Sequence, residues 1–208
     1  MIPAQPTLLL DDTSVLIPDV FEVHGRSQPD KAAVICGPVR RNWGDFTANI
    51  NRVANALHAR GIGPGHQVAV LMGNSVEMLE ITFGIVRAGA CVVPLSGLLT
   101  GEQLATLIDD SDAVMLFATA DFNDRLGHHR AQCPQLRADG CIAVFHESPG
   151  WVGFDDFLAG AATTPPLANC HAALPFNIIY SSGTTGLPKG IVQSHGARSH
   201  FAWSNALE

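Results

Sequence analysis

The amino-acid sequence predicts an α/β fold in which a mainly parallel sheet is covered by helices. Between residues 33 and 145, apolar runs of strand length alternate with longer runs of helical periodicity, an order typical of parallel strands joined by helical crossovers. The strand-length runs are apolar throughout, as expected for strands that are buried on both faces. The composition agrees: 47% of the 208 residues are hydrophobic and 15% are charged, which is typical of a chain that buries a sizeable core.

The first predicted elements follow one another from residue 46 to residue 88. The apolar face of a helix is formed by Phe46, Ile50, Val53, Ala54 and Leu57. A glycine-rich turn at 61–65 closes this helix. Residues 68–72 then predict a buried strand, and residues 76–88 predict a helix packed on the sheet.

The next elements repeat the same alternation. Residues 88–95 form a strand-like run that ends at a proline. Thr100 and Gln103 have the spacing of a capping box, which predicts that a helix begins there and continues through Ile108. Residues 113–117 predict another apolar strand. We interpret all of these segments as core and assign no chemistry to them.

A loop rich in hydroxyl groups and glycine follows a connecting stretch at 161–173 and the apolar run 176–180. Its hydroxyl donors are Ser181, Ser182, Thr184 and Thr185. Gly183 and Gly186 allow a tight turn that aims backbone N–H groups at an anion, and Lys189 adds a positive charge. The sequence therefore predicts a phosphate-binding loop, placed beyond the carboxyl ends of the parallel strands.

Two other interpretations of this loop fit less well. A Walker A loop places its lysine at the start of a helix, but here Leu187 and Pro188 precede Lys189, and the pair 191–192 is β-branched, which favours a return strand. A P-loop phosphotransferase is therefore disfavoured. A flexible linker is also disfavoured, because apolar strand-like runs bound the loop on both sides.

The run from Ile178 to Gly190 resembles, without gaps, the phosphate-binding loop of the adenylate-forming superfamily, which includes acyl-CoA synthetases, luciferases and the adenylation domains of peptide synthetases. Residues 42–46 and 88–95 resemble two earlier blocks of that superfamily, in the right order. The resemblance implies the N-terminal portion of the large domain, with an α/β subdomain at 1–165 and the strand, loop and next helix at 175–208.

The resemblance also implies a two-step reaction. A small-molecule carboxylic acid attacks the α-phosphorus of ATP to give an acyl-adenylate and pyrophosphate, and the thiol of coenzyme A then takes the acyl group. The residues implied to bind phosphate oxygens are Ser181, Ser182, Gly183, Thr184, Thr185, Gly186 and Lys189. Lys189 is implied to be catalytic, since it would neutralise the charge on the leaving pyrophosphate, and Mg2+ would bridge the phosphates with help from a loop hydroxyl.

Members of the superfamily are more than twice this long, so their adenine and ribose contacts and their C-terminal lysine-bearing domain correspond to sequence after Glu208. We therefore expect the parent protein to be an acid–thiol ligase and this chain alone to be inactive. An exposed apolar sheet edge is also expected, with association, such as a homodimer, as its consequence. The alternatives are a non-catalytic nucleotide- or phosphate-binding module and an amino-acid adenylation domain.

Charge and hydropathy exclude several classes of partner. The net charge of −7 argues against nucleic acid, which requires a basic surface. Apolar runs fall short of the roughly 18 to 20 residues of a membrane helix, and the N-terminus does not resemble a secretory signal. A cytoplasmic location is the resulting expectation.

The cysteines and histidines predict no metal site. The five cysteines are scattered, so we expect reduced thiols rather than a disulfide framework. Isolated histidines lack the positioned partner that catalysis or metal binding requires. Ser194 is predicted to cap the next helix, with His195 as a packing or hydrogen-bonding residue of its first turn.

Overall fold

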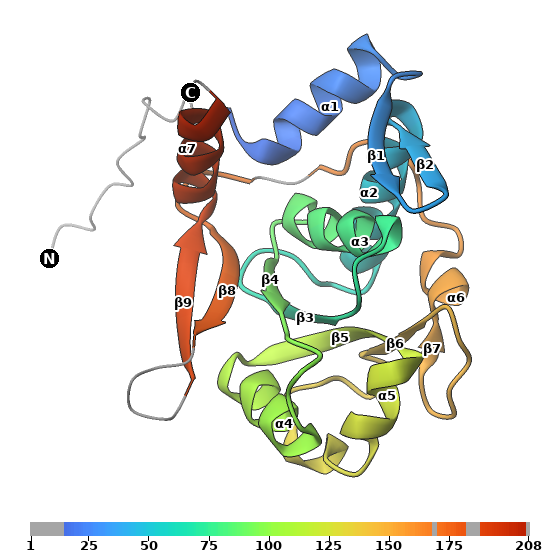
Figure 1. The fold of residues 1–208 in the computed structure, drawn as a ribbon, viewed down its shortest axis with the longest axis vertical. Helices are drawn as coiled ribbons and strands as arrows, with labels where there is room; N and C mark the ends of the chain where they lie inside the picture. The colour runs from blue at the N-terminus through green and yellow to red at the C-terminus, as the bar shows by residue number, and fades with distance from the viewer. Residues whose placement is uncertain (1–14, 168–169, 182–187, 207–208) are drawn as a thin grey trace, which may run out of the picture.

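A computed structural model describes residues 15–167, 170–181 and 188–206. It has three layers, with helices on both faces of a seven-stranded sheet (Figure 1). The strand order is β7-β6-β5-β3-β4-β8-β9, and every neighbouring pair is parallel except β8 and β9. The predicted mainly parallel α/β architecture is confirmed.

The strands of this sheet are β3 (Gln67–Leu71), β4 (Cys91–Pro94), β5 (Ala113–Thr119), β6 (Cys141–Val144), β7 (Val152–Gly153), β8 (Pro175–Ser181) and β9 (Lys189–Ser194). The helices are α1 (Ile17–Ser27), α2 (Trp43–Ala59), α3 (Val76–Arg87), α4 (Gly101–Asp110), α5 (Ala120–Gly127), α6 (Phe154–Leu158) and α7 (His195–Ala206), with a short 3-10 turn at Arg130–Gln132. The predicted helices and strands between residues 46 and 117 are all present, and the connecting stretch 161–173 holds neither helix nor strand in its described residues.

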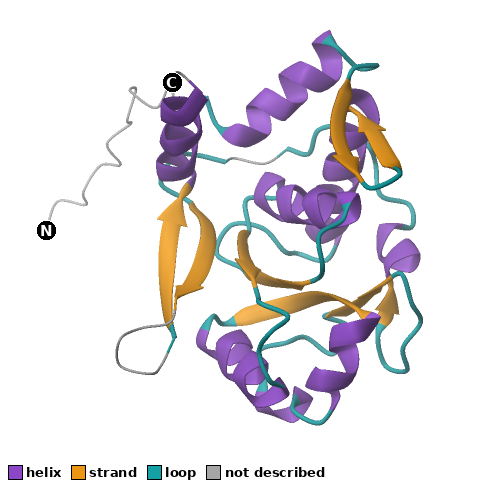
Figure 2. Cartoon of the chain, in the orientation of Figure 1, coloured by secondary structure: helices purple, strands orange, loops and turns teal. Residues whose placement is uncertain are grey.

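One part of the predicted alternation differs. The strands β1 (Ala32–Cys36) and β2 (Val39–Asn42) form a separate antiparallel pair outside the main sheet (Figure 2). Two residues join them, and Gly37 there has φ of +57°. A connection this short permits only a hairpin, because a parallel pair needs a crossover of a dozen or more residues.

Side-chain caps fix where three helices begin. Asn42 Oδ1 accepts a hydrogen bond from the backbone N of Asp45 at 2.7 Å and caps α2. Ser75 Oγ caps α3 in the same way, at 3.0 Å. The predicted capping box of α4 is confirmed, since Gln103 N donates to Thr100 Oγ1 at 3.3 Å and Thr100 N donates to Gln103 Oε1 at 2.9 Å.

Successive residues of the central strands supply two apolar layers. Val68 and Val70 pack in the layer shared with α2, α3 and α6, whereas Ala69 and Leu71 pack in the layer shared with α4 and α5. All four side chains are buried, which is the burial on both faces expected of a parallel sheet between helices. The core therefore lies around β3, β4, β5 and β6.

The β8–β9 hairpin forms one edge of this sheet (Figure 1). Its two strands pair from Pro175↔Ser194 to Ser181↔Lys189, but β8 meets β4 through the single bridge Val92↔Asn177. On the edge strand β9, Ile191 and Val192 are 50% and 60% exposed. The sequence led us to expect an exposed apolar edge at the strand before the loop, but β9 pairs with that strand, β8, and the exposed apolar residues lie on β9 instead.

No helix in the described part of the chain is long and apolar enough to cross a membrane.

Candidate phosphate-binding site

The candidate site lies at the tip of the β8–β9 hairpin. Ser181 is the last residue of β8 and Lys189 the first of β9, and the two are partners in the antiparallel ladder. Both are exposed. The remaining predicted site residues, Ser182, Gly183, Thr184, Thr185 and Gly186, lie outside the described residues.

The position of this tip agrees with the prediction from sequence. Because β8 runs parallel to β4, Ser181 lies at the edge where the parallel strands have their carboxyl ends, the usual place for ligands in such sheets. Lys189 begins a strand and not a helix, so the Walker A arrangement is absent. Among the described residues Lys189 has no ion-pair partner, which leaves its ammonium group available to an anion.

Tyr180, the residue before Ser181, connects the tip to α4. Its hydroxyl donates a hydrogen bond to Asp110 Oδ2 at 2.5 Å and lies 3.4 Å from the carbonyl oxygen of Leu107. Burial raises the pKa of the Tyr180 phenol, and the hydrogen bond and charge of Asp110 raise it further. The phenol is therefore a neutral donor at physiological pH. Sequence analysis missed this contact, because its partners lie 70 residues apart.

At the other end of the hairpin, a buried polar contact joins β8 to α7. Asn177 is 1% exposed, and its Oδ1 accepts a hydrogen bond from Arg198 Nε at 2.8 Å. The Asn177 amide nitrogen also lies 3.4 Å from Gln193 Oε1 on β9. The Arg198 guanidinium lies 6.0 Å from the ring centre of Phe176. These contacts fix the base of the hairpin against the helix that follows it.

His195 opens α7 and is a packing residue. Ser194 Oγ accepts a hydrogen bond from Ala197 N at 3.2 Å, so the predicted helix cap is confirmed. The His195 ring is fully buried, 5.2 Å from the Phe176 ring in an edge-on arrangement, and its nitrogens have no hydrogen-bond partner in the described part of the chain. Burial lowers the pKa of His195 to about 4, helped by the nearby His171. A neutral imidazole without a partner has no acid–base role here.

A hollow lies at the opposite edge of the sheet. It has a volume of about 1200 Å3 and is lined mainly by α2, α3, α6 and the segment after β6. In its wall, Glu80 is 4% exposed, accepts a hydrogen bond from Asn49 Nδ2 at 2.8 Å and forms an ion pair with Arg41 Nε at 2.9 Å. Burial nevertheless raises the pKa of Glu80. The candidate site is kept at the hairpin tip, because Ser181 and Lys189 lie there and not beside this hollow.

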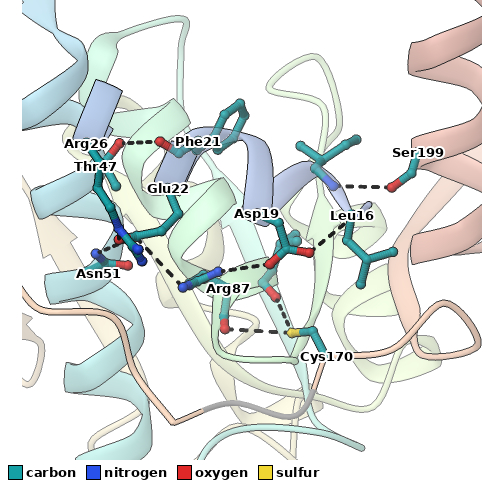
Figure 3. Close-up of polar contacts among 12 residues, drawn as sticks. Leu16, Asp19, Phe21, Glu22, Arg26, Thr47, Asn51, Arg87, Cys170 and Ser199 are labelled. Atoms are coloured by element: carbon teal, nitrogen blue, oxygen red, sulfur yellow. Dashed lines mark hydrogen bonds and ion pairs between the residues drawn. The ribbon is translucent and has the colours of Figure 1, made fainter. Parts of the chain in front are cut away.

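A second polar cluster attaches α1 to the rest of the molecule (Figure 3). Arg87 lies 3.6 Å from Asp19 and 3.8 Å from Glu22. The backbone N of Ile17 donates a hydrogen bond to Ser199 Oγ at 3.2 Å, which ties α1 to α7. These charges are paired within the protein, so the cluster is a structural link and offers no free group for a ligand.

The cysteines behave as expected. All five are free thiols: Cys36, Cys91, Cys133, Cys141 and Cys170. Burial raises the pKa of four of them, and that of Cys91 reaches about 12. Because the thiolate is the nucleophilic form, these four thiols are inert at neutral pH.

Comparison with known proteins identifies a family. The sequence profile of the family described as AMP-binding enzyme matches residues 21–207. The chain is 37% identical over 172 residues to 3-hydroxybenzoate–CoA ligase from Aromatoleum sp. (strain CIB), which covers 80% of this chain and 32% of that protein. It is 30% identical over 201 residues to a component of linear gramicidin synthase from Brevibacillus parabrevis, which covers 94% of this chain and 4% of that protein.

A solved structure shows the same arrangement. The anthranilate CoA ligase AuaEII, in complex with anthranoyl-AMP, superposes with a TM-score of 0.81 and 27% identity over 87% of this chain and 35% of that one. The chain thus spans about a third of the length of these two ligases. The fold, the hairpin that flanks the loop and the family match all agree: the chain belongs to the AMP-binding enzyme family, the adenylate-forming superfamily that its loop resembles.

Proposed function

We propose that this protein activates a carboxylic acid with ATP and then forms a thioester with coenzyme A. In the first step the carboxylate oxygen bonds to the α-phosphorus of ATP and pyrophosphate leaves. In the second step the thiol of coenzyme A replaces AMP at the acyl carbon and loses its proton. The observation that carries the proposal is the pairing of Ser181 with Lys189 at the carboxyl edge of the sheet, on either side of the loop.

The roles of the loop residues follow from their chemistry. Hydroxyl groups of Ser181, Ser182, Thr184 and Thr185 would donate hydrogen bonds to phosphate oxygens. Gly183 and Gly186 would let the backbone approach the phosphates closely. Lys189 would offset the negative charge that grows on the departing pyrophosphate, an electrostatic contribution made mainly in the transition state.

Mg2+ fits the donors at this tip. Hydroxyl oxygens such as that of Ser181 are hard ligands of the kind Mg2+ prefers, and this ion usually binds through few protein groups together with substrate phosphates. The described residues contain no group of three or more His, Cys, Asp or Glu side chains that could hold a metal by themselves. When bound, the ion would supply charge neutralisation on the phosphates.

The acid is proposed by class only. Two of the relatives are named for aryl acids, 3-hydroxybenzoate and anthranilate, and these names describe those relatives. We propose an aryl or fatty acid as the substrate and a CoA ligase in preference to an amino-acid adenylation domain, since the ligase relative has the higher identity, 37% against 30%.

The test is carboxylate-dependent exchange of labelled pyrophosphate into ATP, measured for the complete gene product and for this chain. The panel contains benzoates, fatty acids of several lengths and amino acids, and consumption of the coenzyme A thiol is followed in parallel. We expect exchange and thioester formation by the complete product with an aryl or fatty acid, and no exchange by this chain alone, which spans about a third of the ligase length. Exchange with amino acids only would favour an adenylation domain, and ATP binding without exchange would favour a non-catalytic module.

A further inference from the structure

The hairpin that carries the loop has only a short backbone ladder to the rest of the sheet. Only the bridge Val92↔Asn177 joins β8 to β4, and β9 is an edge strand. This bridge lies four residues before Ser181, so the ladder to the sheet ends well before the tip. Contacts other than the sheet ladder must therefore fix the direction of the tip.

A change of register near the base turns the hairpin toward α4. Between Pro175 and Asn177, β8 contains one residue more than its partner strand β9. Phe176 packs in the core layer of α2 and α3, whereas Ile178 and Tyr180 pack in the layer of α4. A β-bulge re-aims the side chains that follow it in this way. The bulge thus brings the last aromatic ring of β8 against α4.

The helix against which this ring packs, α4, is itself well anchored. Its N-terminus is held by the capping box of Thr100 and Gln103, and Leu104, Leu107 and Ile108 are buried beneath it. Asp110 is the last residue of α4, and its carboxylate accepts the hydrogen bond of the Tyr180 hydroxyl at 2.5 Å. A hydrogen bond to a charged acceptor is stronger than one between neutral groups.

We propose that the Tyr180–Asp110 hydrogen bond is a latch that positions the phosphate-binding loop, with Tyr180 and Asp110 as positioning residues for ATP. The inference rests on the proposed function and deepens it. Tyr180 is covalently adjacent to Ser181, so a fixed phenol fixes the point from which the loop departs. Without the latch the end of β8 keeps its ladder to the exposed strand β9 and the packing of Ile178 and Tyr180 on the layer of α4, but it loses its hydrogen bond to the carboxylate of Asp110. The effect of the latch is expected on ATP, because the loop that it positions is the one proposed to bind the phosphates.

The test compares Tyr180→Phe, Asp110→Ala, Asp110→Asn and the double variant Tyr180→Phe/Asp110→Ala in the complete gene product. Pyrophosphate exchange gives the KM for ATP, the KM for the acid and kcat. We expect the KM for ATP to rise about three- to tenfold in Tyr180→Phe and Asp110→Ala, with the KM for the acid unchanged. The double variant should match the single ones, since both remove the same contact. Asp110→Asn retains an acceptor oxygen and should restore most of the affinity.

Asp109→Ala is the matched control. Asp109 is an exposed carboxylate on the same turn of α4, and the hydroxyl of Tyr180 contacts Asp110 instead. The Asp109→Ala variant should leave the KM for ATP unchanged. An equal rise in the KM for both substrates, an additive double variant, or an effect of Asp109→Ala as large as that of Asp110→Ala would overturn the latch.

A second readout separates the latch from the proposed reaction. Amide hydrogen exchange in β8 and β9 should become faster at Ser181 and Lys189 in Tyr180→Phe and stay unchanged at Asn177. If the wild-type protein exchanges no pyrophosphate with any acid, the proposed function is wrong, and the latch is then judged by hydrogen exchange together with binding of inorganic pyrophosphate. Faster exchange with weaker pyrophosphate binding supports the latch, and no change in either refutes it.

Discussion

The body of the molecule and its loop-bearing hairpin are held together by different forces. Strands β3 to β6 lie between two layers of buried apolar side chains, so hydrophobic burial stabilises them. The β8–β9 hairpin has one bridge to the sheet, an exposed edge and polar contacts at its base and near its tip. The hairpin packs on the body through Phe176, Ile178 and Tyr180 and adds polar contacts that the body does not use in this way, so changes in the two regions should differ in kind.

The largest effect on stability is expected in the body. Phe117 is fully buried on β5, with its ring edge-on to Phe154 and Phe157 at 6.2 and 5.1 Å. Phe117→Ala should lower the free energy of unfolding by about 3 to 5 kcal/mol, because it removes buried area and leaves a cavity. The matched change in the hairpin, Ile191→Ala, should cost less than about 1 kcal/mol, since Ile191 is 50% exposed. Urea denaturation of both variants measures the difference, and equal losses would contradict the comparison.

The hairpin should instead show the largest effect on activity. Lys189→Ala is expected to lower pyrophosphate exchange by the complete gene product about 100-fold, because it removes a charge placed for the leaving pyrophosphate. The fold should be unchanged, since Lys189 is exposed and without an ion-pair partner among the described residues. The sequence has one other lysine, Lys31, which precedes β1, so Lys31→Ala is the control and should keep full activity. Full activity of Lys189→Ala would show that Lys189 does not stabilise the leaving pyrophosphate.

Close packing between two helices of the body predicts a smaller effect. A Cβ added to Gly84 on α3 would lie 2.5 Å from Cβ of Val53 on α2, too close for either backbone to remain in place. Gly84→Ala should therefore destabilise the chain by about 1 to 3 kcal/mol, measured by thermal or urea unfolding. Gly127→Ala on α5 is the control, because nothing lies within 4 Å of its added Cβ.

Local patterns in the sequence predict most of the body and part of the site. Side-chain caps formed by Thr100 and Ser194, each with a residue three positions later, set the beginnings of α4 and α7. The β-branched pair 191–192 indicates the return strand that begins at Lys189. These features depend on neighbours in sequence, so spacing and residue type are sufficient to predict them. The phosphate-binding roles of residues 182–186 rest on the resemblance and stay predictions.

The contacts that orient the hairpin could not be predicted in this way. Tyr180 and Asp110 lie 70 residues apart, and Asn177 and Arg198 lie on different elements that meet only after the sheet is assembled. The face of the sheet on which the Tyr180 ring lies also depends on the one-residue bulge after Pro175. Strict alternation along β8 would place this ring on the same face as Phe176. Such contacts depend on register and packing, which the order of apolar and polar residues does not encode.

The smallest predicted effect is a dependence of stability on pH that originates at the base of the hairpin. The folded state holds the pKa of His195 at about 4, against 6.5 for an unperturbed histidine, so between these values the unfolded chain binds more protons. Stability from this group is present above pH 6.5 and is lost as the pH falls toward 4. Between pH 7 and pH 6 the free energy of unfolding should fall by about 0.7 kcal/mol. The size of this fall depends mainly on the pKa of His195 in the unfolded chain. Urea unfolding at both pH values should show this change in the wild type and in His128→Leu, whose histidine is exposed. His195→Leu should lack it, and a variant that retained the full pH dependence would show that another group is responsible.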